Sequence, residues 1–82
     1  MTDLARTPKQ IGNSIRRTRK KSGLNQAQLA AVSGLRQETI SLIETGNPAT
    51  KLETILAVLA ALDLEFQIAP RSKEHTSIED IF

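Results

Sequence analysis

Residues 23–44, GLNQAQLAAVSGLRQETISLIE, constrain the fold of this chain more than any other segment. They are typical of two short helices on either side of a turn. Asn25 can cap the first helix, and Gly34 can adopt the positive φ angle that a tight turn requires. Ala30 is small enough to let the helices approach, and Ile40 can fill the corner between them. The pattern predicts two helices joined at a sharp angle.

Two further helices are expected to flank this corner. Thr7 and Pro8 favour a helix start, Gly23 favours its end, and the first helix is expected over residues 8–22.

The helix after Gly34 is expected from Arg36 or Gln37 to about Thr45. Thr50 and Glu53 resemble a capping box, which predicts a last helix over residues 51–62. Its apolar residues, expected to supply most of the core, are Leu52, Ile55, Leu56, Leu59 and Leu62. In the helix before Gly34, Leu29 and Val32 are expected to face inward.

The hydrophobic period changes to two after the last helix. Leu64, Phe66 and Ile68 alternate with Glu65, Gln67 and Ala69, which predicts a half-buried strand ended by Pro70. A single strand leaves its backbone groups unpaired. The simplest partner is the same strand of a second copy, in an antiparallel ribbon across a two-fold axis. The alternatives are that the last helix continues or that the segment packs as coil.

The composition limits the chemistry available to the chain. Its 82 residues are enough for one small domain with a modest core. The chain has no cysteine, and its one histidine, His75, lies in a polar tail, so no metal site, cofactor or catalytic residue is expected. Glu79 and Asp80 are adjacent and do not form a convincing catalytic pair. No apolar run approaches the roughly 20 residues of a membrane span, and residues 1–10 do not resemble a signal peptide. We therefore expect a cytoplasmic protein that is not an enzyme.

The charge is divided unevenly along the chain. Residues 1–51 contain nine lysines and arginines and three acidic residues, whereas residues 52–82 contain two basic and six acidic residues. The basic half contains the predicted helical corner. This asymmetry fits a surface that faces nucleic-acid phosphates, although a solvated basic face without a partner would have the same composition.

The beginning of the helix after Gly34 has side chains suited to reading bases. Arginine can bridge O6 and N7 of guanine, and glutamine can bridge N6 and N7 of adenine, in the major groove. Glu38 could accept a hydrogen bond from cytosine, reject other sequences, or only favour the helix N-terminus through its dipole. The candidate base-contacting residues are Arg36, Gln37, Glu38 and Ser41. Candidate phosphate-contacting residues are Thr39, Asn47, Arg16 and Arg17, although each could be merely exposed.

The caps, glycines and corner residues described above, with the segment GLNQAQLA, resemble the Cro/C1-type (XRE-type) helix-turn-helix family over roughly residues 8–62. The continuation SLIETGNPATKLETILAVLAALDLEFQI is similar to HipB-type antitoxins. The resemblance implies a mainly α, lambda-repressor-like domain of four or five helices with a C-terminal β-strand that pairs across a homodimer. On this interpretation residues 1–7 are a flexible N-terminus, residues 8–69 form the DNA-binding and dimerisation domain, and residues 70–82 form a flexible tail.

The resemblance also implies roles for individual residues. Gln26 stands where the family has a glutamine that contacts a phosphate and braces the recognition helix, and Gln37 stands where phage repressors have an adenine-reading glutamine. Arg36 replaces the serine or threonine that often caps the recognition helix, which suggests that it reads a base instead. Arg19 and Glu44 match a structural ion pair between the first and third helices.

Two functions follow from the resemblance. One is a homodimeric, sequence-specific repressor that binds a pseudo-palindromic operator in double-stranded DNA. The other adds toxin neutralisation, in which the protein would bind a HipA-type serine/threonine kinase toxin and repress its own operon. In that case the tail could dock on the toxin through Ile78, Ile81 and Phe82, although a free tail is the alternative. A stand-alone or phage-type repressor without a toxin partner is the other interpretation.

Overall fold

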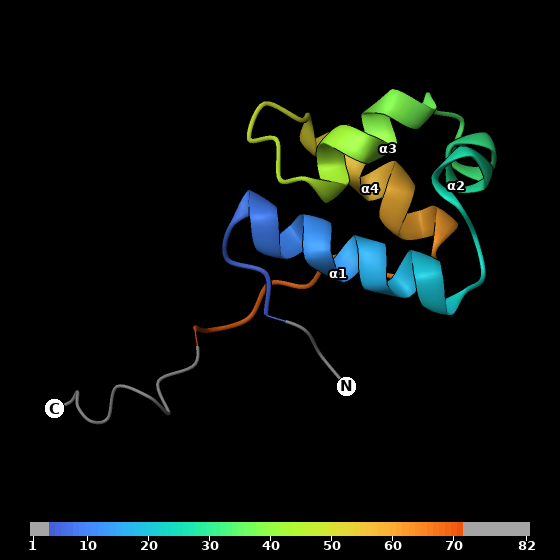
Figure 1. The fold of residues 1–82 in the computed structure, drawn as a ribbon. Coiled ribbons are helices and arrows are strands. Elements are labelled where there is room, and N and C mark those ends of the chain that lie inside the picture. Colours follow the sequence, from blue (N-terminus) through green and yellow to red (C-terminus); the bar gives the residue numbers. More distant parts are fainter. Residues whose placement is uncertain (1–3, 72–82) are drawn as a thin grey trace, which may run out of the picture.

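A computed structural model describes residues 4–71 of the chain. Within this range the chain forms four helices and no β-strand (Figure 1). The helices are α1 (Pro8–Lys21), α2 (Gln26–Ser33), α3 (Gln37–Glu44) and α4 (Leu52–Ala61). The predicted mainly α class and helix order are confirmed. No helix within residues 4–71 is long and apolar enough to cross a membrane.

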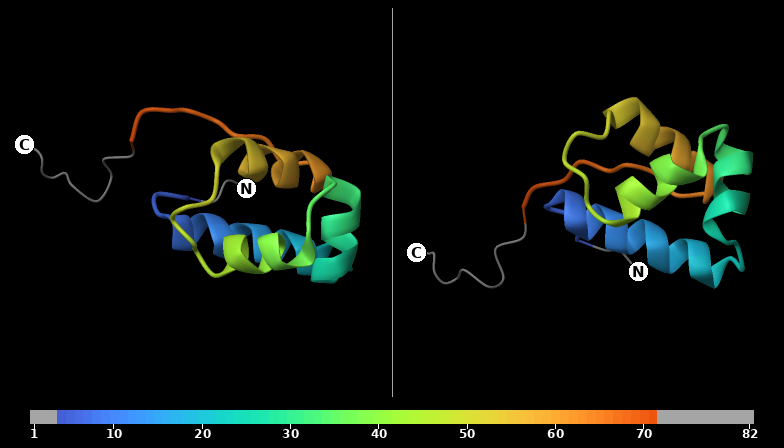
Figure 2. Two further views of the ribbon diagram at one scale, coloured as in Figure 1. Left: turned by 90° about the horizontal axis from the view of Figure 1, so that it is seen from above. Right: turned by 45° about the horizontal axis from the view of Figure 1, so that its top comes forward.

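The helices pack around the corner between α2 and α3. α1 lies against α3, and α4 lies against α2 (Figures 1 and 2). Gly34 ends α2 with φ of 74°, in the left-handed region, as the turn requires. Residues 64–71 pass on the side of the molecule away from α3 in these views. Residues 64–71 therefore leave the outer surface of α3 uncovered.

Each helix contributes at least one fully buried aliphatic side chain. The largest are Ile15 of α1, Leu29 of α2, Ile40 of α3 and Val58 of α4. Ala30, Ile43 and Leu62 complete the buried cluster, which Ile11, Leu24, Leu35, Ile55, Leu59 and Ala61 surround. The predicted positions of Ala30 and Ile40 at the corner are confirmed by their burial.

Other expectations about the core are wrong. Leu52 and Leu56 are 60% and 43% exposed, whereas Val58 is completely buried. Val58 belongs to the buried cluster formed by all four helices, with Ile55 and Leu59 packed against it, and the two leucines lie outside that cluster. Val32 is 62% exposed because the packed face of α2 contains Leu29 and Ala30 instead.

The capping boxes that the sequence predicts at Thr7 and Gln10 and at Asn25 and Gln28 form in part at α1 and completely at α2. The Asn25 side chain accepts from the Gln28 backbone N–H, and the Gln28 side chain accepts from that of Asn25. At α1, Thr7 accepts from the backbone N–H of Gln10, but the Gln10 side chain reaches Arg6 rather than Thr7.

The capping box predicted at Thr50 and Glu53 is wrong. The helix begins at Leu52 after Lys51, which provides no side-chain cap. The Thr50 hydroxyl instead donates to the carbonyl of Asn47 at 3.2 Å. The loop between α3 and α4 therefore uses the hydroxyl to stabilise itself.

The segment after α4 is neither helix nor strand. α4 ends at Ala61, so the alternative in which the helix continues through this segment is wrong. Asp63 adopts φ of 59° and turns the chain back beside α4 (Figure 2). Phe66 and Ile68 are then 51% and 93% exposed. Pairing of this segment across a dimer stays a prediction, since the structure contains one chain.

Candidate DNA-binding interface

The N-terminal half of α1 is seated directly on the C-terminal end of α3. A Cβ atom at Gly12 would overlap the backbone carbonyl oxygen of Ile43 and lie 2.9 Å from that of Glu44. At Gly46, where φ is 86°, a Cβ atom would lie 2.8 Å from Cα of Lys9. The close approach therefore requires glycine on both sides. In the sequence, Gly12 is marked only as a glycine inside a predicted helix, and this does not reveal its contact with α3.

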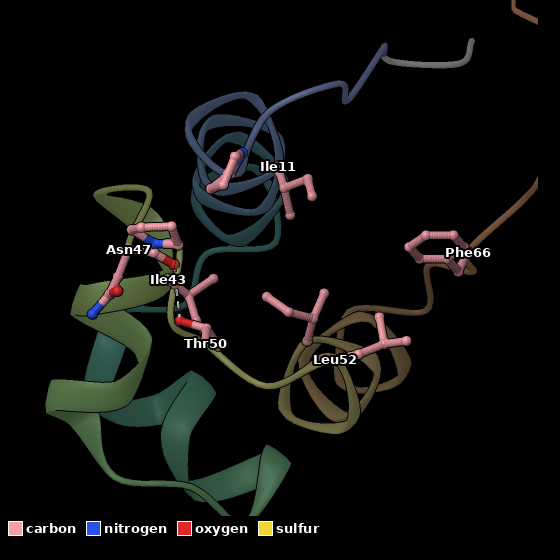
Figure 3. Close-up of a pocket in the computed structure, with 9 residues that line it drawn as sticks. Ile11, Ile43, Asn47, Thr50, Leu52 and Phe66 are labelled. Atoms are coloured by element: carbon pink, nitrogen blue, oxygen red, sulfur yellow. Dashed lines mark hydrogen bonds between the residues drawn. The ribbon is translucent and has the colours of Figure 1, made fainter.

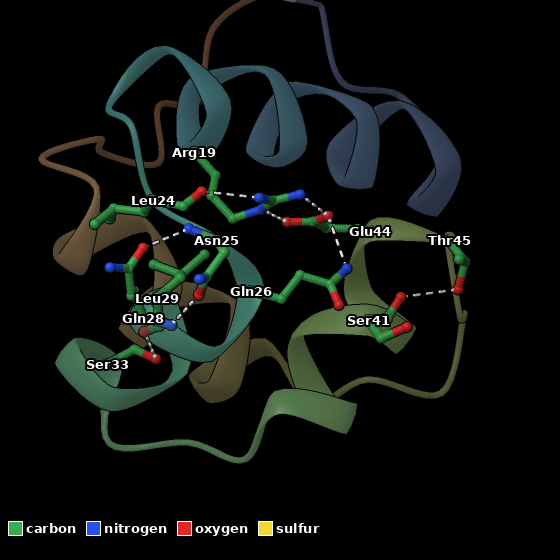
Figure 4. Close-up of polar contacts among 10 residues, drawn as sticks. All are labelled: Arg19, Leu24, Asn25, Gln26, Gln28, Leu29, Ser33, Ser41, Glu44 and Thr45. Atoms are coloured by element: carbon green, nitrogen blue, oxygen red, sulfur yellow. Dashed lines mark hydrogen bonds and ion pairs between the residues drawn. The ribbon is translucent and has the colours of Figure 1, made fainter.

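A buried ion pair joins α1 to α3 beside this contact. Nε of Arg19 lies 2.6 Å from Oε2 of Glu44, and Nη2 of Arg19 donates to Oε1 at 3.0 Å (Figure 4). Nη1 also donates to the carbonyl of Leu24, 2.9 Å away, in the connection between α1 and α2. Both side chains are almost fully buried. One guanidinium thus fixes three segments of the chain relative to one another.

Gln26, the first residue of α2, extends this network. Its Nε2 donates to Oε1 of Glu44 at 3.2 Å (Figure 4). Burial alone would raise the pKa of the Glu44 carboxyl, but hydrogen bonds from Arg19 and Gln26, with the positive charges of Arg19 and Arg16, hold that pKa below its ordinary value. The same pairing raises the pKa of Arg19. The carboxylate at the end of α3 is therefore ionised and held by both α1 and α2.

The opposite end of α3 is exposed. Arg36 precedes the helix as its N-cap residue and makes no capping hydrogen bond with its side chain. Arg36, Gln37 and Glu38 are exposed, and within residues 4–71 their side chains make no hydrogen bond or ion pair. These side chains can therefore meet a ligand without first breaking an internal interaction.

The remaining candidates lie around α3 in different environments. Thr39 and Ser41 are half-buried on the helix itself. Asn47 follows the C-terminal end of α3, where its Oδ1 accepts from the backbone of Ala49 at 2.8 Å. On α1, Arg16 is exposed and its charge acts on Glu44, whereas Nη2 of Arg17 donates to Oγ of Ser14 at 3.4 Å.

The structure thus brings Gln26 and Arg16 close to Glu44 and places the four base-contact candidates at or along α3. The roles assigned to these residues in DNA binding stay predictions. The tail candidates Ile78, Ile81 and Phe82 lie outside the described residues. Within residues 4–71 there is no group of three potential metal ligands.

Known proteins share both the sequence pattern and the fold. The helix-turn-helix family matches residues 15–68. The antitoxin HipB of Escherichia coli K12 is 30% identical over 79 residues, which cover 89% of this chain and 90% of HipB. A HipB–O4 20mer complex has a TM-score of 0.80 at 28% identity and covers 87% of this chain and all of that chain. A HipA–HipB–O2–O3 complex has a TM-score of 0.78 at 30% identity with the same coverage.

Proposed function

The chain belongs to the helix-turn-helix family and is similar to HipB antitoxins, and on that premise we propose that it is a homodimeric, sequence-specific transcriptional repressor. One observation carries the proposal: α3 is braced at its C-terminal end while its N-terminal end is exposed. A rigid helix with uncommitted polar side chains at its tip suits insertion into a DNA major groove. The relatives are transcriptional regulators and antitoxins, which agrees with this role.

In this proposal the tip of α3 reads the operator. Arg36 bridges a guanine and Gln37 bridges an adenine, and each discriminates by about 1–3 kcal/mol. Glu38 and Ser41 complete the base-contacting set. Gln26, Thr39, Asn47, Arg16 and Arg17 contact phosphates and fix the register of the protein on the duplex. In a dimer, two copies of α3 enter major grooves about 34 Å apart on a pseudo-palindromic site.

The operator assignment is tested by binding-site selection with the purified protein, followed by titrations of the selected and a scrambled duplex at stated salt. The variant with both Arg36→Ala and Gln37→Ala should lose its preference for the selected duplex while it keeps the wild-type unfolding curve. Arg6→Ala, which removes a charge outside α3, is the control and should keep the preference. If the double variant bound the selected duplex with wild-type affinity and kept the preference for it over the scrambled duplex, the assignment would be overturned.

We further infer that the protein is the antitoxin of a HipA-type serine/threonine kinase and represses its own operon. The similarity to HipB covers most of both chains, and HipB is found in complex with HipA. This supports a kinase partner for this chain, with Ile78, Ile81 and Phe82 as candidate docking residues. Co-expression with the kinase gene of the same operon should yield a complex that survives purification and lowers kinase activity.

Failure of the two proteins to associate would favour a stand-alone repressor. A variant without residues 70–82 separates operator binding from docking on the kinase through the tail. Loss of the complex with operator binding retained would support tail docking, whereas an unchanged complex would place docking elsewhere.

A further inference from the structure

The outer face of α3 carries a large apolar side chain among its polar ones. Leu42 is 49% exposed and is the one large hydrophobic residue of α3 that is exposed. Four residues separate it from Glu38, so the two side chains lie on the same face of the helix, one turn apart. Ile40 and Ile43 are buried on the opposite face. Leu42 therefore continues the surface that begins with the base-contact candidates.

The next exposed residue on this surface does not offer its hydroxyl proton to a ligand. Thr45 follows Leu42 by three residues, and its hydroxyl donates to the backbone carbonyl of Ser41 at 3.1 Å (Figure 4). The same hydroxyl lies 3.1 Å from the carbonyl of Leu42. The first turn of α3, in contrast, presents Arg36 and Gln37 without internal hydrogen bonds of their side chains. The surface of α3 thus changes from polar at its tip to apolar around Leu42.

Other exposed apolar side chains gather away from this surface. Phe66 lines an apolar groove of about 170 Å³ with Ile11 and Leu52 (Figure 3). Residues 64–71 pass on the side of the molecule away from α3 (Figure 2). A homodimer built on that segment would leave Leu42 uncovered. A single exposed leucine is common on protein surfaces, and what makes this one informative is its place on the helix that carries the base-contact candidates.

Resting on the proposed operator binding, we propose that Leu42 is a specificity-determining residue that contacts the C5-methyl group of a thymine in the major groove. Thymine is the only one of the four bases that presents a methyl group there. A leucine side chain neither donates nor accepts hydrogen bonds, so packing it against the amino group of cytosine would leave that donor unpaired. Leu42 therefore favours thymine by apolar contact and disfavours cytosine by an unmet hydrogen bond.

Replacement of thymine by deoxyuridine tests this contact, because it removes the methyl group and keeps the hydrogen-bonding groups of the base. The probe is the duplex obtained by binding-site selection, with each thymine of one half-site replaced in turn. The wild-type protein should bind one of these duplexes about fourfold more weakly, the change expected when one methyl-sized group loses its apolar contact. Leu42→Ala should bind the thymine and deoxyuridine forms at that position with equal affinity.

Matched variants separate this contact from a general loss of apolar surface. Val32→Ala shortens an exposed apolar side chain on α2 and should keep the fourfold difference. Leu42→Gln keeps the length of the side chain and should lose the difference as Leu42→Ala does, so the test does not depend on one variant. All three variants should keep the wild-type unfolding curve, since the altered side chains are exposed.

Each contrary outcome has a distinct meaning. A fourfold difference that persists in both Leu42 variants would assign the methyl contact to another residue and overturn the proposal. Equal binding of all the deoxyuridine duplexes by the wild-type protein, with the selected duplex still preferred over a scrambled one, would overturn it while leaving operator binding intact. No preference for any selected duplex would overturn the proposed function, and the role of Leu42 with it.

Discussion

The contact between α1 and α3 and the outer surface of α4 represent two different ways of using side chains. The first is complete in one chain: glycines bring the backbones together, and a buried ion pair and an amide fix their positions. The second is not covered within one chain: Leu52 and Leu56 of α4 remain exposed, as do Phe66 and Ile68 of the segment that follows it. The comparison teaches that the contact that orients α3 is satisfied within one chain, whereas the exposed apolar side chains would be covered only in the proposed homodimer.

The largest effect is expected at the ion pair. Arg19→Met leaves the Glu44 carboxylate buried without its charge partner, which should reduce the free energy of unfolding by about 3–5 kcal/mol. Urea denaturation measures this, and the loss should not depend on protein concentration. Lys20→Met changes the exposed neighbour and should cost less than about 0.5 kcal/mol. Equal losses of unfolding free energy in Arg19→Met and Lys20→Met would show that the ion pair between Arg19 and Glu44 does not stabilise the fold.

The next effect concerns Gly12. Gly12→Ala forces a methyl group against backbone carbonyls that cannot rotate away, and overpacking of this kind costs about 1–3 kcal/mol or more. Asn13→Ala, at an exposed position of the same helix, should be neutral or slightly stabilising because alanine is the better helix former. Urea denaturation of both variants measures the two changes in the free energy of unfolding. If Gly12→Ala were stabilising, α1 and α3 would be able to move apart at little cost.

The uncovered region should respond differently. We expect the exposed face of α4 to be covered in the proposed homodimer. Leu56→Lys should then leave the monomer folded and weaken dimerisation by about 1–2 kcal/mol, part of the roughly 1.5–3 kcal/mol for burying a whole leucine side chain, because Leu56 is only 43% exposed in one chain. Light scattering and operator titration over a range of protein concentrations measure the change. Val32→Lys is the control, since Val32 is also exposed but lies on α2. Dimerisation unaffected by Leu56→Lys would remove α4 from the interface.

The smallest effect is expected in how the free energy of unfolding depends on pH. Because the folded state holds the pKa of Glu44 below its ordinary value of 4.5, the carboxylate stabilises the fold fully above that pH. This contribution is lost as the pH falls from 4.5 through the lowered pKa of the folded state. Urea denaturation at pH 6 and pH 3 should show that Glu44→Gln lacks this component. The same pH dependence in both proteins would assign the acid sensitivity to other groups.

Local patterns predicted the helical corner well because short-range chemistry determines it. Asn25 and Gln28 cap each other within four residues, and Gly34 meets a purely local backbone requirement. The positions of Leu52 and Val58 could not be predicted in the same way. Both belong to an apolar helix, and the choice between them depends on where α2 lies, which is a tertiary property.

The site shows the same division between local and tertiary information. The pairing of Arg19 with Glu44 came from family resemblance, since no local pattern connects residues 25 positions apart. The third member, Gln26, was expected to brace the recognition helix, but its contact with Glu44 required the structure. Gly12 could have been suspected from its unfavourable position within a helix.

The uncapped beginning of α3 has a consequence for how this protein can be improved. A serine at position 36 would provide the cap that Arg36 lacks, and caps of this kind contribute about 1 kcal/mol. Selection for thermal stability alone should therefore favour Arg36→Ser and weaken operator discrimination at the same time. A screen that records only melting temperature would count as an improvement a protein that has become a poorer regulator.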